Sequence, residues 1–291
     1  MKANKTKTLY NYRTKARRMT ETKHLFPILD QKLIELLKSL DANDWLKPSA
    51  ARLWSVKDIA AHLLDGNLRT LSFSRDKFIL PPDREISSYQ DLVDYLNQFN
   101  ADWVKAAKRL SPAVLIDLLE QTGKEYSDHI QTLDPDETAM FSVAWAGEET
   151  SKNWFHIARE YTEKWHHQQQ IRQATNRPGI LTRELFYPFI STLLLGLPHV
   201  YRNVLAPEAT TVQIIINSQI GGKWFLLKTN RGWQISDTPS HKLTASITLD
   251  PDHAWQLFTK ALKPTEVIDQ IEISGDYDLA YHALTLIAVM G

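Results

Sequence analysis

The residues best suited to chemistry lie on a short segment in the middle of the chain. His156, Glu160, Glu163 and His167 follow one another at spacings of four, three and four residues. On an α-helix these spacings place all four side chains on one continuous stripe. Imidazole nitrogens and carboxylate oxygens are metal ligands, so the stripe can present several ligands to one divalent ion. A solvated helix face without function explains the same pattern, because Glu and His pairs at this spacing are common on exposed helices.

An aromatic stripe on the same segment competes for burial. Trp154, Ala158, Tyr161 and Trp165 repeat the spacing on nearly the opposite side of the helix. If only one side of the helix were buried, the hydrophobic effect would favour the aromatic side.

A metal site also needs a ligand from elsewhere in the chain, and His62 is a candidate. Ile59 and Leu63 lie beside it on the expected buried side of its helix. An ordinary core histidine with its hydrogen bonds satisfied accounts equally for this placement.

Composition excludes several classes of site. The chain has 291 residues and no cysteine, so disulfides, thiolate metal ligands and a cysteine nucleophile are all excluded. Residues 1–24 hold eight Lys or Arg and one acid. This segment lacks the apolar core of a signal peptide and the interleaving of aromatic with basic residues that a nucleic-acid stacking surface has. We therefore expect a disordered basic leader over residues 1–21 and no nucleic-acid partner.

The longest apolar stretches fall well short of the roughly 20 residues that a membrane span requires. We therefore expect a cytoplasmic monomer or small homo-oligomer that acts on a small molecule and does not bind membranes.

The periodicity of apolar residues predicts the elements that must position these side chains. Ser55 and Asp58 have the spacing of a helix-capping box, and Pro112 is placed to begin a helix. In the first part of the chain, the pattern predicts helices over residues 25–40, 55–75, 88–110, 112–133 and 150–174.

The second part of the chain mixes both kinds of element. Its helices are expected over residues 184–204, 250–262 and 276–290, and its strands over residues 211–217, 223–228, 232–236, 243–249 and 271–274. The expected fold class is α+β overall: a helical bundle over residues 22–178 is followed by a small α+β domain over residues 179–291.

Two motifs resemble a known family. Trp54-Ser-Val-Lys-Asp-Ile-Ala-Ala-His62-Leu63, together with Glu163 and His167 four residues later, is similar to the mycothiol-dependent maleylpyruvate isomerases, a branch of the DinB-like metal-binding bundles. The resemblance implies an up-down bundle with a metal on His62, Glu163 and His167. It continues into residues 252–258 and 273–280, and the C-terminal domain is expected to be sterol-carrier-protein-like. The family often has Asp three residues after the last His, where this chain has Gln170.

The resemblance also implies a chemistry. Two imidazoles and one carboxylate leave coordination positions open, as in catalytic zinc sites, and nickel, iron or manganese suit the same ligands. Zinc is our first expectation. A low-molecular-weight thiol of the mycothiol or bacillithiol type would bind there for S-transfer or cis/trans isomerisation. His156, Glu160 and His166 remain substitute ligands or outer partners, and the sequence assigns no further catalytic or thiol-binding residue.

Two other functions stay open. The same metal could activate water for hydrolysis. Alternatively, the C-terminal domain could hold an apolar ligand in a protein without catalytic activity.

Overall fold

The computed structural model describes residues 20–51, 53–236, 238 and 243–289. Most of the expected basic leader, residues 1–19, lies outside this description. By their contacts, residues 22–134 and 163–180 form one compact unit, which we call the helical unit. Residues 135–162 and 181–289 belong to the other, which we call the sheet unit. The expected domain boundary at residue 178 stays a prediction.

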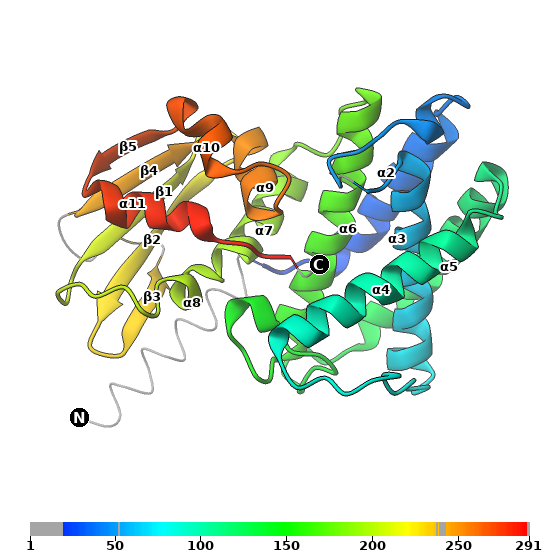
Figure 1. Cartoon of the computed structure of the whole chain (residues 1–291), viewed down its shortest axis with the longest axis horizontal. Coiled ribbons are helices and arrows are strands. Elements are labelled where there is room, and N and C mark those ends of the chain that lie inside the picture. Colours follow the sequence, from blue (N-terminus) through cyan, green and yellow to red (C-terminus); the bar gives the residue numbers. More distant parts are fainter. Residues whose placement is uncertain (1–19, 52, 237, 239–242, 290–291) are drawn as a thin grey trace. The chain divides into compact units, whose positions relative to one another are not determined.

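The helical unit is built from long helices, as Figure 1 shows. Ser55 and Asp58 form the expected capping box: the amide of Asp58 donates to Ser55 Oγ, and the amide of Ser55 donates to the Asp58 carboxylate at 3.0 Å. The elements are α2 (Phe26–Lys38), α3 (Val56–Thr70) with a π-helical turn η3 (Leu71–Arg75), α4 (Tyr89–Ala107), α5 (Pro112–Thr132) and the C-terminal part of α6 (Asn153–Thr175).

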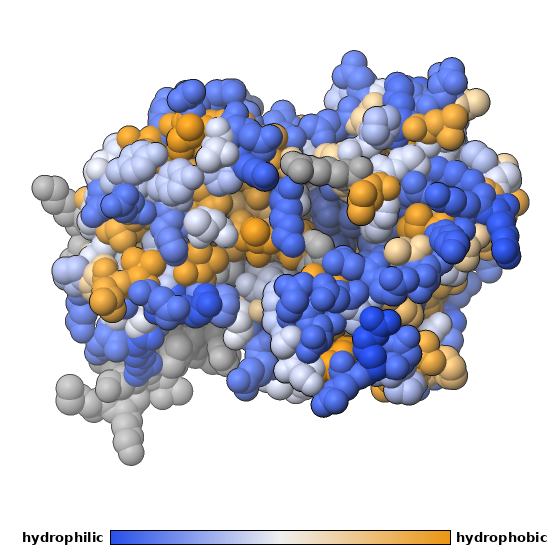
Figure 2. Space-filling model, viewed as in Figure 1, coloured by the Kyte–Doolittle hydropathy of each residue, from blue (hydrophilic) through white to orange (hydrophobic). Residues whose placement is uncertain are grey.

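The core of this unit confirms the apolar periodicity read from the sequence. Leu33 and Leu37 of α2 are buried together with Ile59 of α3, Leu119 of α5 and Ile171 of α6. Burying each such side chain contributes about 1.5–3 kcal/mol, which is enough to fix how these helices pack. The visible face of the unit is mostly hydrophilic, with apolar residues scattered over it (Figure 2).

The sheet unit contains one mixed sheet with strand order β3-β2-β1-β4-β5. Strand β1 pairs in parallel with β4, and the other neighbours pair antiparallel. Its elements are α7 (Arg183–Leu194), α8 (Leu197–Val200), β1 (Thr211–Ile216), β2 (Gly222–Thr229), β3 (Gly232–Ser236), β4 (Ala245–Leu249), α9 (Pro251–Phe258), α10 (Pro264–Val267), β5 (Glu272–Gly275) and α11 (Tyr277–His282). The α+β class is therefore confirmed.

Three expected helices end earlier than the sequence predicted. The helix over residues 184–204 is interrupted, because α7 ends at Leu194 and α8 begins afresh beside Pro198. Helix α9 ends at Phe258, before Lys260 adopts a left-handed backbone with φ 64°.

The last helix is also shorter than predicted. Helix α11 and the 3-10 turn that follows it end at Thr285 instead of Met290. The amide of Ala288 donates to the Phe258 carbonyl at 2.9 Å, a tertiary hydrogen bond that sequence periodicity does not report. Within the described ranges, every helix is too short or too polar to span a lipid bilayer.

Candidate metal centre

Two helices of the helical unit bring His62 beside His167, and α6 by itself brings Glu163 beside His167. His62 lies on α3, and its ring centroid is 4.7 Å from that of His167 on α6. On α6 itself, Glu163 Oε2 lies 3.7 Å from His167 Nε2. Two ligand atoms bound to one tetrahedral ion at about 2 Å each are separated by roughly 3.3 Å. The Glu163 and His167 atoms therefore need to move only slightly to share an ion.

The local sequence explains why these side chains face one another. Glu163 and His167 are one helical turn apart, so they project from the same side of α6. On α3, the buried Ile59 and Leu63 hold the His62 side of the helix towards the core. The core contacts that pack α3 into the unit therefore also turn His62 inward.

His166 is a second histidine within reach of the same ion. Among the described residues, one group of His and acidic side chains has ligand atoms that all lie within 4.8 Å of one another, and it consists of Glu163, His166 and His167. The rings of His166 and His167 have centroids 3.9 Å apart. His62 is not a member of this group. The three α6 side chains therefore form one candidate ligand set, and the predicted set with His62 requires the His62 imidazole to move closer to Glu163 and His167.

Burial keeps the two facing imidazoles neutral. It holds the pKa of His62 well below its usual value, and nearby His167 and Arg69 lower it further. The pKa of His167 falls to about 3, first because of burial and then because of His166, although Glu163 and Gln170 oppose this shift. At neutral pH both rings therefore carry a nitrogen lone pair, which is the form that binds metal.

Gln170 decides which nitrogen of His167 is available. Its Oε1 lies 2.9 Å from His167 Nδ1. An amide oxygen only accepts hydrogen bonds, so Nδ1 carries the proton and Nε2, which faces Glu163, carries the lone pair. Gln170 stands where the resembled family often has Asp, and it offers His167 an acceptor that is not a carboxylate.

A divalent ion fits this donor set. Nδ1 of His62 is buried and makes no hydrogen bond within the described structure. A buried polar atom without a partner carries a desolvation penalty that binding a cation would remove. Nε2 of His167 and the Glu163 carboxylate are nitrogen and oxygen donors of the kind that zinc and its neighbours prefer, and the His62 ring lies 4.7 Å from that of His167.

Trp54 packs against the two candidate histidines. Its ring centroids lie 4.8 Å from His62 and 6.1 Å from His167. The half-buried indole shields one side of the cluster from water. The family motif in the sequence includes Trp54, but no contact was predicted for it. Its position eight residues before His62 is the signal that could have suggested a contact with that histidine.

The other two members of the polar stripe have different partners. His156 Nδ1 lies 3.1 Å from an Arg159 guanidinium nitrogen, and Arg159 also pairs with Glu160 at 2.7 Å. Both belong to the part of α6 that is assigned to the sheet unit. Their role as substitute ligands stays a prediction that these contacts do not support.

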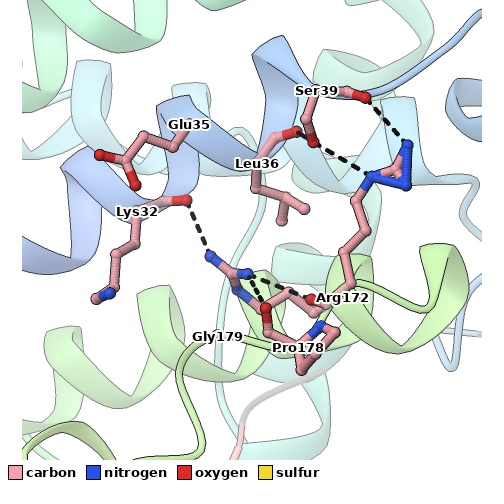
Figure 3. Close-up of a pocket in the computed structure, with 8 residues that line it drawn as sticks. Lys32, Glu35, Leu36, Ser39, Arg172, Pro178 and Gly179 are labelled. Carbon is pink, nitrogen blue, oxygen red and sulfur yellow. Dashed lines mark hydrogen bonds between the residues drawn. The ribbon is translucent and has the colours of Figure 1, made fainter.

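A separate pocket in the helical unit is lined by residues whose hydrogen bonds hold two helices together. Arg172 donates from Nη1 to the carbonyls of Arg177 and Pro178, and from Nη2 to the carbonyl of Lys32 (Figure 3). These bonds tie the end of α6 to α2. The remaining lining residues are Glu35, Leu36, Ser39 and Gly179.

Comparison with known proteins gives a family and a set of solved structures. The family described as "Mycothiol maleylpyruvate isomerase N-terminal domain" matches residues 26–172, a range that includes all three predicted ligands. A crystal structure of a mutant of the mycothiol-dependent maleylpyruvate isomerase shares 10% identity at a TM-score of 0.47, covering 84% of this chain and 90% of that chain. A second crystal structure of that enzyme shares 10% identity at 0.46, covering 82% and 88%. No curated protein matches the chain significantly.

Proposed function

We propose that this chain, which belongs to the mycothiol maleylpyruvate isomerase family, is an enzyme that holds one divalent metal ion on His62, Glu163 and His167 and uses it to bind a low-molecular-weight thiol. The observation that carries this proposal is the approach of the His62 ring to within 4.7 Å of the His167 ring, from a different helix. This approach of side chains from two helices, within the residues that the family matches, supports the proposal.

The chemistry would be divided between the ion and the protein. A bound divalent ion lowers the pKa of a coordinated thiol and so favours the thiolate, which is the nucleophilic form. Three protein ligands leave a coordination position open for that sulfur. The chain has no cysteine, so the thiol must come from solution.

The protein residues prepare this position. Gln170 accepts a hydrogen bond from His167, and the Glu163 carboxylate beside that ring would balance part of the charge of a bound ion. Trp54 keeps water away from one side of the histidines. The reaction we propose is addition of the thiolate to an electrophilic carbon of a small substrate, either as S-transfer or as addition and elimination that isomerises a cis double bond.

Metal binding is the first test. Purified apoprotein is titrated with Zn²⁺ or Co²⁺ against a chelator, and its thermal midpoint is followed in parallel. Wild type should bind one ion and gain stability with metal concentration, as ligand linkage requires. His62→Ala, Glu163→Gln and His167→Ala should each abolish the gain, while the apo variants keep their helical circular dichroism.

The same titration separates the two ligand sets. His166→Ala should retain stoichiometric binding if His62 completes the site. Loss of binding in His166→Ala together with unchanged binding in His62→Ala would overturn the proposed set in favour of α6 alone. Unchanged stoichiometry in all four variants would remove the metal centre altogether.

The thiol is tested next, with mycothiol as the probe and bacillithiol and glutathione as comparisons. Metal-loaded protein should be stabilised further by at least one thiol, and apoprotein should not. Turnover of a cis-configured unsaturated dicarboxylate should then require both metal and that thiol. Hydrolytic turnover without thiol would favour the water-activating alternative, and metal-independent stabilisation by fatty acids would favour the lipid-binding one.

A further inference from the structure

A buried lysine follows one candidate ligand directly in the sequence. Lys164, the residue after Glu163, donates from Nζ to Asp30 Oδ1 at 2.9 Å and to Asn67 Oδ1 at 2.7 Å. Its ammonium also lies 4.3 Å from the ring centroid of Tyr126. The side chain is only 10% exposed. One cation on α6 therefore contacts α2, α3 and α5.

The acceptors of this lysine are themselves held in place. Asn67 Nδ2 donates to Thr122 Oγ1 at 3.1 Å, and the Thr122 hydroxyl donates a hydrogen bond to the Leu118 carbonyl at 2.7 Å. Ser127 donates to the second oxygen of Asp30 at 3.1 Å. Each polar group of this buried network has a hydrogen-bond partner, and hydrogen bonds are directional. The network therefore permits one arrangement of the helices, whereas apolar contacts alone would permit several.

The position of the network along the helices relates it to the metal centre. Asn67 follows His62 by five residues on α3, which is about 7.5 Å along the helix axis. Lys164 lies between Glu163 and His167 on α6. The Asn67–Lys164 hydrogen bond thus connects the two ligand-bearing helices within about two helical turns of each ligand, and a slide or rotation of α6 against α3 would break it.

Stability alone is a weak explanation for this arrangement. Burying an ion pair costs desolvation energy that well-packed apolar residues of similar size would avoid, and the best-attested use of such groups is to fix register. Ligands held by ordered neighbours bind metal more tightly, and loss of an outer-shell partner typically costs about 10–100-fold in affinity.

We propose that the Asn67–Lys164 hydrogen bond is a positioning element for the metal centre: it sets the register of α6 against α3 so that Glu163 and His167 face His62. The proposal rests on the proposed function, because it assumes that these three residues bind the ion. It adds Lys164 and Asn67 as positioning residues.

Asn67→Ala tests the proposal, with Ser127→Ala as its matched control. Asn67→Ala removes the hydrogen bonds of Asn67 with Lys164 and with Thr122. Ser127→Ala removes one bond of the same network, between α5 and α2, and leaves the α3–α6 bond intact. Asn67→Asp keeps an oxygen for Lys164 and serves as the rescue variant. The Co²⁺ dissociation constant and ligand-field absorption spectrum are measured for each folded apoprotein, together with its thermal midpoint without metal.

We expect Asn67→Ala to weaken Co²⁺ binding by about tenfold or more and to alter the absorption spectrum. Ser127→Ala should stay within about twofold of wild type, and Asn67→Asp should recover most of the loss. A purely structural role would lower both thermal midpoints and leave both dissociation constants and spectra unchanged. That result would overturn the proposal, as would equal losses of affinity in the two alanine variants.

The experiment distinguishes failure of the proposed function from failure of the positioning proposal. If wild type binds no Co²⁺, the proposed function fails. If wild type binds Co²⁺ through His62, Glu163 and His167 while Asn67→Ala binds it equally well, only the positioning proposal fails. Should Asn67→Ala not fold, Asn67→Ser, whose shorter hydroxyl cannot span the same distance, replaces it with the same expected loss.

Discussion

The side-chain oxygen of Gln170 lies 2.9 Å from Nδ1 of His167, within one turn of the same helix. This contact determines that the proton of the neutral imidazole sits on Nδ1 and that Nε2 faces Glu163. A glutamine can therefore orient a ligating histidine without adding a negative charge. Burial already keeps His167 neutral, and the contact with Gln170 leaves the lone pair of its ring on Nε2.

Replacing Gln170 should weaken metal binding. We expect Gln170→Leu to raise the dissociation constant for Zn²⁺ by about 10–100-fold, because the histidine tautomer and ring orientation are no longer fixed. Gln170→Glu, which keeps the acceptor, should bind at least as tightly as wild type. Competition with a chromophoric chelator measures both values.

The control for this experiment is Gln169→Leu. Gln169 is also buried, but its Oε1 makes no hydrogen bond within the described structure. Its substitution should leave Zn²⁺ affinity within about threefold of wild type. Equal loss in the two leucine variants would mean that Gln170 acts through packing and not through His167.

The Lys164–Asp30 ion pair gives a prediction about stability. Lys164→Met should lower the free energy of unfolding by about 3–5 kcal/mol, because the Asp30 carboxylate is left buried without its cation. The double variant Asp30→Asn with Lys164→Met should recover much of this loss, since no uncompensated charge remains. Urea denaturation of the apoproteins, followed by circular dichroism, measures the difference. A double variant as unstable as the sum of the two single variants would contradict the prediction.

Gly179 and Arg172 should be energetically coupled. A Cβ at Gly179 would lie 2.5 Å from Nη1 of Arg172, whose guanidinium is fixed by three backbone carbonyls. Gly179→Ala should therefore cost roughly 1–3 kcal/mol in wild type, because it displaces these hydrogen bonds. The same change should cost almost nothing in an Arg172→Ala background. A double-mutant cycle of unfolding free energies measures the coupling. If the effects of the two substitutions are strictly additive, the guanidinium moves aside without a cost and the prediction is wrong.

His156 gives a prediction about pH. Burial is the main reason that its pKa falls to about 4 in the folded chain, and Arg159 lowers it further. The unfolded chain takes up a proton near pH 6.5, before the folded chain does, so the stability due to neutral His156 is present above pH 6.5 and is lost as pH falls towards 4. The loss is of the order of 3 kcal/mol. His156→Gln should flatten this part of the stability profile, measured by urea denaturation between pH 7 and 4.

NMR titration of the same group provides an independent check. The ring protons of His156 should shift with a midpoint near pH 4, well below the ordinary value for a histidine. A midpoint near 6.5 would contradict the assignment of a buried, neutral ring.

The sequence by itself determined where the helical segments begin and how the candidate metal ligands are spaced along them. The capping box of Ser55 and Asp58 predicted the start of α3. The four-residue spacing of Glu163 and His167 placed two candidate metal ligands on one side of α6. These signals are local: a cap or a helical period depends on residues within a few positions of one another, and such patterns can be read without knowing what packs against them.

Only the tertiary structure decided which of the possible contacts exist. It brought His62 to His167, gave Gln170 its place on Nδ1, and paired Lys164 with Asn67 across two helices. It also ended the last helix early, where Ala288 bonds to Phe258. Each of these depends on residues that packing brings together or turns towards one another. Hydrophobic periodicity reports which side of a helix is buried and carries no information on the partner that buries it.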